Sequence, residues 1–98
     1  MNISVNERPL VTVAFFAYNS ERFMREAVES VFVQTYSPLE IILSDDCSTD
    51  GTFGVIRDLV GRYQGPHRVV VNRNPTNLGG PEHVNRLLEM ARGEFIVQ

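Results

Sequence analysis

The chain has 98 residues, of which 43% are hydrophobic and 21% charged, and its formal net charge is −3. That length limits it to one domain at most. The acidic balance, without a cluster of Lys and Arg, argues against nucleic acid as the principal partner. The single cysteine excludes an internal disulfide, and no apolar run approaches the length of a membrane span.

The start of the chain is polar and includes Glu7 and Arg8, which does not fit a secretory signal peptide. Residues 1–8 are expected to form a flexible leader before a domain that spans residues 9–98. We expect a cytoplasmic chain, with a peripheral membrane location left open for a longer parent protein.

Apolar runs and helical periodicities alternate along the rest of the chain. Runs rich in Val and Ile predict buried strands of a parallel sheet, at residues 10–17, 39–44, 68–72 and 94–98. Apolar residues three and four apart predict three intervening helices, which begin near Asn19 or Ser20, near Asp50 and at Pro81. The third helix is expected to carry Gly93 as its C-terminal cap. Its predicted apolar stripe is Val84, Leu87, Leu88 and Ala91.

The alternation β-α-β-α-β-α-β predicts the α/β class: a Rossmann-like half-sheet of parallel strands with helices on its faces. Right-handed crossovers favour the strand order 3-2-1-4. Because residues 95–97 form an apolar strand at the very end, we expect a fragment of a longer protein. A complete small domain with an edge strand is the alternative. The exposed strand predicts that the fragment self-associates.

Polar residues gather where the predicted strands lead into helices. The first junction holds Ala17, Tyr18 and Asn19, and the second holds Asp45 and Asp46. The third junction offers Arg73, followed by Asn74 and residues 77–80. Because the carboxyl ends of parallel strands share one edge, these residues should converge there, where ligands bind.

A planar aromatic residue, a carboxylate and an arginine together suit a nucleotide. Tyr18 could stack on the base, and a carboxylate could accept the imide N–H of uracil or thymine. Arg73 could pair with phosphate. The sequence has neither the glycine pattern of a dinucleotide-binding turn nor that of a P-loop.

Structural roles are the alternative to nucleotide binding for several of these residues. Ser48, Thr49 and Asp50 are expected to be helix caps. One carboxylate of the Asp45-Asp46 pair could satisfy loop donors, but two adjacent carboxylates both serving the structure is less expected. Both histidines, His67 and His83, are expected at the surface, and Cys47 is expected to be a small packing residue.

Several segments follow one another at the spacing of the N-terminal half of family 2 glycosyltransferases, which the chain resembles from Pro9 onward. The resemblance implies the GT-A fold and inverting transfer of a sugar from a nucleotide sugar, with a UDP-sugar expected, to a saccharide or lipid acceptor. The segments that carry it are Val11-Thr12-Val13, Ala17-Tyr18-Asn19, Glu29-Ser30-Val31, Gln34-Thr35-Tyr36, Glu40-Ile41-Ile42, Asp45 to Thr52, Asn77-Leu78-Gly79 and Ala91 to Ile96.

The resemblance also implies roles for individual residues. Tyr18 matches the aromatic residue that packs on the base, and Asp46 matches the Asp that binds the base edge. Asp45 matches its supporting neighbour, and Ala17 and Asn19 match the loop that borders the nucleotide. Arg73 lies near the region where the family sometimes places a basic residue on the phosphates.

The chain also departs from the family pattern. Phe16 stands where Pro is frequent, Cys47 stands where Gly is frequent, and residues 80–86 differ from the usual Ala-Arg-Asn-x-Gly. The family's Asp-x-Asp, which binds Mn²⁺ or Mg²⁺ and the diphosphate, would follow residue 98, as would the general base. The fragment is therefore expected to be inactive and to hold no metal itself.

Two alternative functions belong to other classes of protein. A non-catalytic nucleotide-binding module would lack the Asp-x-Asp in the complete protein as well. A receiver-like signalling domain would need its acidic pair close to the end of the first strand, where this chain has Ala17-Tyr18-Asn19 instead.

Overall fold

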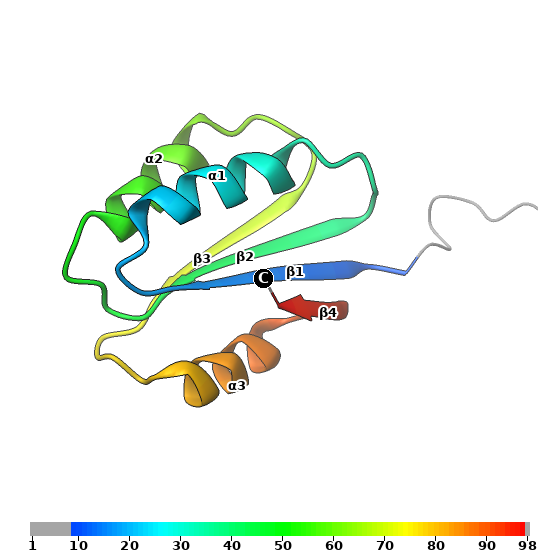
Figure 1. Cartoon of the computed structure of the whole chain (residues 1–98). Helices are drawn as coiled ribbons and strands as arrows, with labels where there is room; N and C mark the ends of the chain where they lie inside the picture. The colour runs from blue at the N-terminus through cyan, green and yellow to red at the C-terminus, as the bar shows by residue number, and fades with distance from the viewer. Residues whose placement is uncertain (1–8, 98) are drawn as a thin grey trace, which may run out of the picture.

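The computed structural model describes residues 9–97, with the side chains of residues 94–97 left out (Figure 1). Strands and helices alternate throughout. Their bounds are β1 Val11–Ala17, α1 Glu21–Phe32, β2 Leu39–Asp45, α2 Thr52–Arg62, β3 Arg68–Arg73, α3 Gly80–Met90 and β4 Glu94–Val97. The leader expected at residues 1–8 and the expected last strand residue, Gln98, lie outside the described residues.

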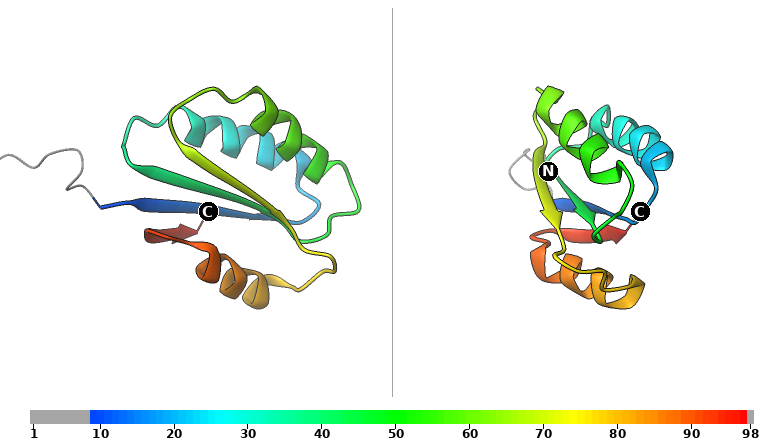
Figure 2. Two further views of the ribbon diagram at one scale, coloured as in Figure 1. Left: turned by 180° about the vertical axis from the view of Figure 1, so that it is seen from behind. Right: turned by 90° about the vertical axis from the view of Figure 1, so that its left-hand side faces the viewer.

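The four strands form one parallel sheet in the order β3-β2-β1-β4, as predicted. Helices α1 and α2 cover one face of the sheet, and α3 covers the other beside β4 (Figures 1 and 2). The chain therefore has the three-layer arrangement of an α/β half-sheet.

Strand β2 is the centre of the fold, and all seven of its residues are buried. Successive side chains along β2 point to opposite faces of the sheet. Ile41 and Leu43 pack in the large cluster with α1 and α2, whereas Ile42 packs with Ala14 and Leu87 on the α3 side. A strand buried on both faces explains the apolar run Ile41-Ile42-Leu43 within it.

A buried carboxylate joins the amino-terminal ends of the strands. Glu40 is fully buried, accepts hydrogen bonds from the Thr12 hydroxyl (2.9 Å) and the Arg92 backbone N–H (3.0 Å), and pairs with Arg68 Nε at 3.1 Å. The Thr12 hydroxyl in turn accepts from the Gly93 N–H at 3.0 Å. These contacts attach the α3–β4 turn to the sheet, at the end opposite the candidate site.

Gly93 has a different role from the one predicted. Helix α3 ends at Met90 with Ala91 as its cap residue, so Gly93 is not a helix cap. A Cβ at Gly93 would meet the Leu10 carbonyl oxygen. Glycine is therefore required there for close approach of two backbone segments.

The third helix is also rotated relative to its predicted stripe. It begins at Gly80 rather than Pro81, and its fully buried residues are His83 and Leu87. Leu88, expected in the stripe, is half exposed. Among residues 9–97, the structure contains no helix with the length and hydrophobicity needed to cross a membrane.

Candidate functional site

The three predicted junctions meet at the carboxyl edge of the sheet. Ala17 pairs with Asp45 across β1 and β2, and Asp45 pairs with Arg73 across β2 and β3. The pairing continues one residue further, because the Asp46 N–H donates to the Ala17 carbonyl and the Asn74 N–H to the Asp45 carbonyl, each at 2.8 Å. The predicted convergence is therefore confirmed.

The Asp46 carboxylate is only 3% exposed and organises the loop after β3. Its Oδ1 accepts from Asn74 Nδ2 and from the Leu78 N–H, both at 2.8 Å, and its Oδ2 accepts from the Gly79 N–H at 2.9 Å. Burial alone would raise the pKa of Asp46. The three hydrogen bonds and nearby His83 outweigh burial and hold that pKa below its usual value. Asp46 is therefore ionised at neutral pH, with one acceptor position on Oδ2 still open.

Asp45 organises the loop after its own strand. Its carboxylate is fully buried and accepts from the Ser48 N–H at 2.9 Å and from the Ser48 hydroxyl. Arg73 Nε lies 3.5 Å from Asp45 Oδ2, and Arg73 Nη2 donates to the Ser48 carbonyl at 3.3 Å. The Arg73 guanidinium also lies 4.9 Å from the centre of the Phe53 ring. The arginine thus supports the loop of Asp45, and it retains further N–H donors.

Both carboxylates therefore serve the chain's own donors. The expectation that the pair would not both serve the structure is wrong, because two different loops supply donors to two separate carboxylates. Asp45 holds residues 46–48, and Asp46 holds residues 74–79. The Arg73 charge beside Asp45 offsets the repulsion between the neighbouring carboxylates.

The loops after β1 and β2 are tied together by hydrogen bonds. Asn19 Oδ1 accepts from the Thr49 N–H (2.9 Å) and the Asp50 N–H (3.3 Å), while the Asn19 N–H donates to the Ser48 hydroxyl (2.9 Å). Asn19 adopts φ 48°, a left-handed conformation that Asn tolerates better than most residues. Two further bonds, from Ser20 N–H to the Thr52 hydroxyl and from Gly51 N–H to Glu21 Oε1, extend this loop clamp.

The clamp corrects the expected helix caps. Ser48 and Thr49 cap no helix, because their groups bond to Asp45 and Asn19. The residue before α2 is Gly51, without a side-chain cap bond, whereas Asp50 accepts from the Thr52 N–H at 2.9 Å just outside the helix. Hydrogen bonds from Thr52 therefore lower the pKa of Asp50 against the smaller opposing effect of burial.

Cys47 occupies a strained turn. Its φ is 62°, in the left-handed region that favours glycine. The thiol lies 3.6 Å from the Pro75 carbonyl, so it contacts the neighbouring loop. Packing, rather than nucleophilic chemistry, matches this position.

Two aromatic residues, Phe16 and Tyr18, precede and follow Ala17 at the end of β1. Tyr18 is 48% exposed, so much of its side chain is accessible to solvent. Phe16 meets the His83 ring edge to face, with the ring centres 5.6 Å apart. The strand end therefore presents Tyr18 outward and anchors Phe16 against α3.

Neither histidine lies at the surface, so that expectation is wrong. His67 is largely buried and its Nε2 lies 2.7 Å from the Gln34 carbonyl. His83 is fully buried, with Nε2 2.6 Å from the Ser44 hydroxyl. Burial lowers the pKa of His83, against the opposing charges of Asp46 and Asp45. The sequence did offer a signal for a buried polar partner of His83. Side chains alternate between the two faces along a strand, which places Ser44 on the same face as Ile42 and Asp46.

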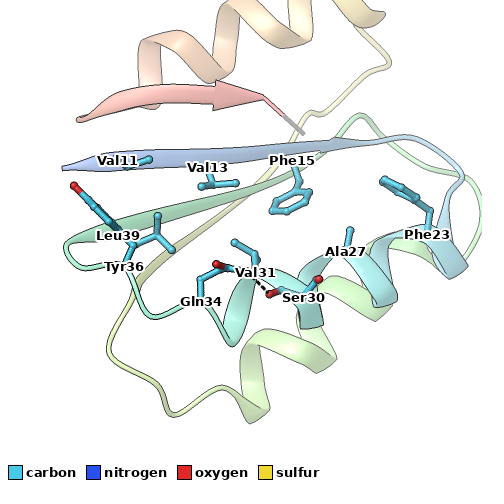
Figure 3. Close-up of a pocket in the computed structure, with 10 residues that line it drawn as sticks. All are labelled: Val11, Val13, Phe15, Phe23, Ala27, Ser30, Val31, Gln34, Tyr36 and Leu39. Carbon is cyan, nitrogen blue, oxygen red and sulfur yellow. Dashed lines mark hydrogen bonds between the residues drawn. The ribbon is translucent and has the colours of Figure 1, made fainter. Parts of the chain in front are cut away.

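An apolar groove of about 620 Å³ lies between β1 and α1 (Figure 3). Val13, Phe15, Ala27 and Val31 point into it from the strand and the helix. Polar groups are sparse there, and the groove runs along the body of β1 rather than across the strand ends. It contributes no recognisable chemistry to the candidate site.

A metal centre does not fit the residues that the structure describes. They contain no group of three or more His, Cys, Asp or Glu side chains arranged to hold an ion. Asp45 and Asp46, the nearest candidates, already accept hydrogen bonds from their own loops. The acidic pair is thus built for N–H donors.

Comparison with known proteins assigns this architecture to a family. The family model "Glycosyl transferase family 2" matches residues 12–97. EpsE of Bacillus subtilis (strain 168), provisionally named a glycosyltransferase, is 35% identical over 94 residues, which are 96% of this chain and 33% of EpsE. TuaG of the same strain, provisionally named a teichuronic acid biosynthesis glycosyltransferase, is 36% identical over 92 residues, which are 93% of this chain and 35% of TuaG. The chain thus spans about a third of these relatives.

Solved structures agree in fold. A Pyrobaculum calidifontis mannosyltransferase, PcManGT, in complex with GDP-Man and Mn²⁺ superposes with a TM-score of 0.79 at 28% identity, covering 95% of this chain and 27% of that one. Residues 1–349 of S. aureus TarS in complex with UDP-GlcNAc give 0.73 at 30% identity, covering 89% and 26%. With its parallel half-sheet, its acidic strand end and a family match over residues 12–97, the chain belongs to glycosyl transferase family 2.

Proposed function

We propose that this chain is the nucleotide-binding part of an inverting glycosyltransferase, which transfers a sugar from a UDP-sugar to a saccharide or lipid acceptor. The observation that carries the proposal is the Asp46 carboxylate, ionised and oriented by three hydrogen bonds, with an acceptor position left on Oδ2. It lies at the carboxyl edge of the sheet, where open α/β folds bind ligands.

In this proposal the base lies between Tyr18 and the loop that Asp46 organises. The exposed Tyr18 ring offers a stacking surface. Ala17 and Asn19 border the nucleotide, and Asn19 does so through backbone and loop geometry, because its side-chain oxygen is engaged by residues 49 and 50. Asp45 acts as support for the loop between β2 and α2.

Contacts within the chain limit how Arg73 could bind a phosphate. Its Nε and Nη2 groups face Asp45 and the Ser48 carbonyl, so a phosphate contact would use the N–H groups that remain. An arginine already held in place loses less side-chain entropy when it binds an anion. We keep the phosphate contact as a proposal and expect Arg73→Lys to weaken both functions, because lysine lacks the planar fork.

The carboxylate predicts which bases the site accepts. Uracil presents an N–H at position 3, which a carboxylate can accept, whereas cytosine presents an acceptor there and would leave Asp46 facing a lone pair. Guanine also presents an N–H, so the carboxylate alone does not separate UDP from GDP. The TarS complex contains UDP-GlcNAc and the PcManGT complex contains GDP-Man. Our choice of UDP follows the sequence resemblance.

The test is titration calorimetry with UDP, GDP and CDP on the chain, and on any longer polypeptide that carries it. We expect UDP to bind more tightly than CDP by about 100-fold, the cost of placing an acceptor against a buried carboxylate. Equal binding of UDP and CDP would contradict base recognition by Asp46.

The remaining parts of the reaction are proposals about the longer protein. The divalent ion would be held by residues outside those described, and it would neutralise the leaving diphosphate. PcManGT was solved with Mn²⁺, which supports use of a divalent ion in the family. Activity of the longer polypeptide should disappear on chelation and return with Mn²⁺ or Mg²⁺.

Two further proposals concern the self-association and the cellular location of the chain. We expect it to self-associate, which sedimentation at high concentration tests, and a monomer there would end the idea. We expect a cytoplasmic location, with peripheral membrane attachment open for a longer protein, which cell fractionation tests.

A further inference from the structure

His83 is an unusual residue for the middle of a small domain. It lies on the first turn of α3 and is fully buried, and its Nε2 contacts the Ser44 hydroxyl at 2.6 Å. Its Nδ1 has no hydrogen-bond partner among the residues that the structure describes. Burying half an imidazole unsatisfied costs stability. A leucine would fill the place at lower cost, so the imidazole calls for another explanation.

A continuous path of side-chain hydrogen bonds runs from His83 to Asp46. The Ser44 hydroxyl contacts His83 and accepts from Asn72 Nδ2 at 2.9 Å. Asn72 Nδ2 also donates to Asn74 Oδ1 at 3.0 Å, and Asn74 Nδ2 donates to Asp46 Oδ1 at 2.8 Å. The path links α3, β2 and β3 to the carboxylate that is proposed to bind the base. We call these five residues the polar relay.

We assign the tautomer of His83 from the donors around it. Because the Ser44 oxygen already accepts from Asn72, its own hydrogen is available for His83 Nε2. In this assignment Nε2 is an acceptor and the imidazole is neutral, with its hydrogen on Nδ1. Burial, which lowers the pKa of His83, favours that neutral form. The polar relay therefore ends in an acceptor at both ends, the carboxylate and the imidazole.

Resting on the proposed nucleotide site, we propose that His83 is a positioning residue for Asp46, acting through Ser44, Asn72 and Asn74. By accepting the Ser44 hydroxyl, His83 fixes the orientation of the Asn72 amide. That amide fixes Asn74, and Asn74 holds Asp46 Oδ1, which keeps Oδ2 directed at the base. Buried side-chain networks of this kind couple their members beyond pairwise contacts.

The test compares variants that differ in one acceptor. His83→Leu removes the acceptor and keeps an apolar volume, whereas His83→Gln restores an acceptor close to the position of Nε2. Ser44→Ala breaks the polar relay at the next residue. We expect His83→Leu and Ser44→Ala each to raise the Kd for a UDP-sugar by about tenfold, and His83→Gln to stay within a factor of about three of the original chain.

A double variant provides the matched control. If the polar relay acts as a unit, His83→Leu with Ser44→Ala should bind no more weakly than either single variant. Losses that multiply to about 100-fold would overturn the proposal. So would a His83→Gln variant as weak as His83→Leu, because a purely structural role of the imidazole would not be rescued by an acceptor.

A second readout needs no nucleotide. The Leu78 and Gly79 N–H groups donate to Asp46, so their proton chemical shifts report its orientation. His83→Leu should move both signals and His83→Gln should return them. Unmoved signals in folded His83→Leu would overturn the positioning role. Signals that move as expected, together with no nucleotide binding by a longer polypeptide that carries this chain, would support the positioning role and refute the proposed function instead.

Discussion

Replacing Asp46 by Asn changes one atom of the candidate site and keeps its shape. In Asp46→Asn the remaining oxygen can still accept from Asn74 and Leu78, which both bond to Oδ1. The new amide nitrogen replaces Oδ2, which accepts from the Gly79 N–H at 2.9 Å in the original chain. In the variant two donors therefore face each other. One hydrogen bond is lost outright, and two lose the strengthening that a charge provides.

The loss of stability follows from these contacts. A hydrogen bond to a charged group contributes about 1.5–3 kcal/mol, and a neutral one about 1 kcal/mol. Losing the Gly79 bond and weakening the other two should lower the free energy of unfolding by about 3 kcal/mol. With a urea m-value of about 1.5 kcal/mol/M, the unfolding midpoint should fall by about 2 M.

Binding should change in a way that stability alone cannot produce. The amide presents a donor where the carboxylate presented an acceptor, so Asp46→Asn should weaken UDP by about 100-fold. The same donor can bond the ring acceptor of cytosine, so the variant should bind CDP more tightly than the original chain does. Calorimetry with both nucleotides measures this exchange.

The control is Asp58→Asn, the same chemical change on the exposed side of α2, where Asp58 pairs with Arg62 at 3.2 Å. That variant should change the free energy of unfolding by less than about 0.5 kcal/mol and leave both nucleotides unaffected. An Asp46→Asn chain with unchanged UDP affinity would refute base recognition by Asp46. An unchanged urea midpoint would refute the energetic importance of the three hydrogen bonds.

Three further predictions concern stability, each measured by urea unfolding. Glu40→Ala should lower the unfolding free energy by about 3 kcal/mol, because it leaves the buried Thr12 hydroxyl of β1 and the Arg92 N–H of the α3–β4 turn without their acceptor; a loss below about 1 kcal/mol would show that water replaces the carboxylate. At Cys47, whose φ is 62°, Gly should be tolerated and Val should cost about 2 kcal/mol more than Gly, while equal stabilities would contradict the strain. Because the pKa of His83 is lowered in the folded chain, stability should be full above the ordinary imidazole pKa of 6.5 and decline as pH falls through the lowered value, and His83→Gln should remove that decline.

The sheet could be predicted because its signals are local. The run Ile41-Ile42-Leu43 places apolar side chains on both faces, which is typical of a central parallel strand, and right-handed crossovers left the order 3-2-1-4 as the favoured topology. The meeting of Ala17, Asp45 and Arg73 followed from topology alone, since parallel strands end at one edge.

The hydrogen bonds of the site could not be predicted in the same way. Asp46 bonds to Leu78 and Gly79, which lie more than thirty positions further along the chain, so no local pattern links them. The burial of His83 depends on how α3 turns against the sheet. In that orientation His83 contacts Phe16 and Ser44, which lie on other elements and far away in the sequence.

The loop clamp between residues 19–21 and 48–52 has a consequence for binding kinetics. Its bonds, such as those from Thr49 and Asp50 to Asn19 Oδ1, join protein atoms only and therefore persist whether or not a nucleotide is present. A nucleotide that docks there does not have to order these loops, so it loses less conformational entropy than one that folds its own site. Association should then proceed at similar rates for nucleotides that fit well and for those that fit badly, and selectivity should be expressed in how long each one stays.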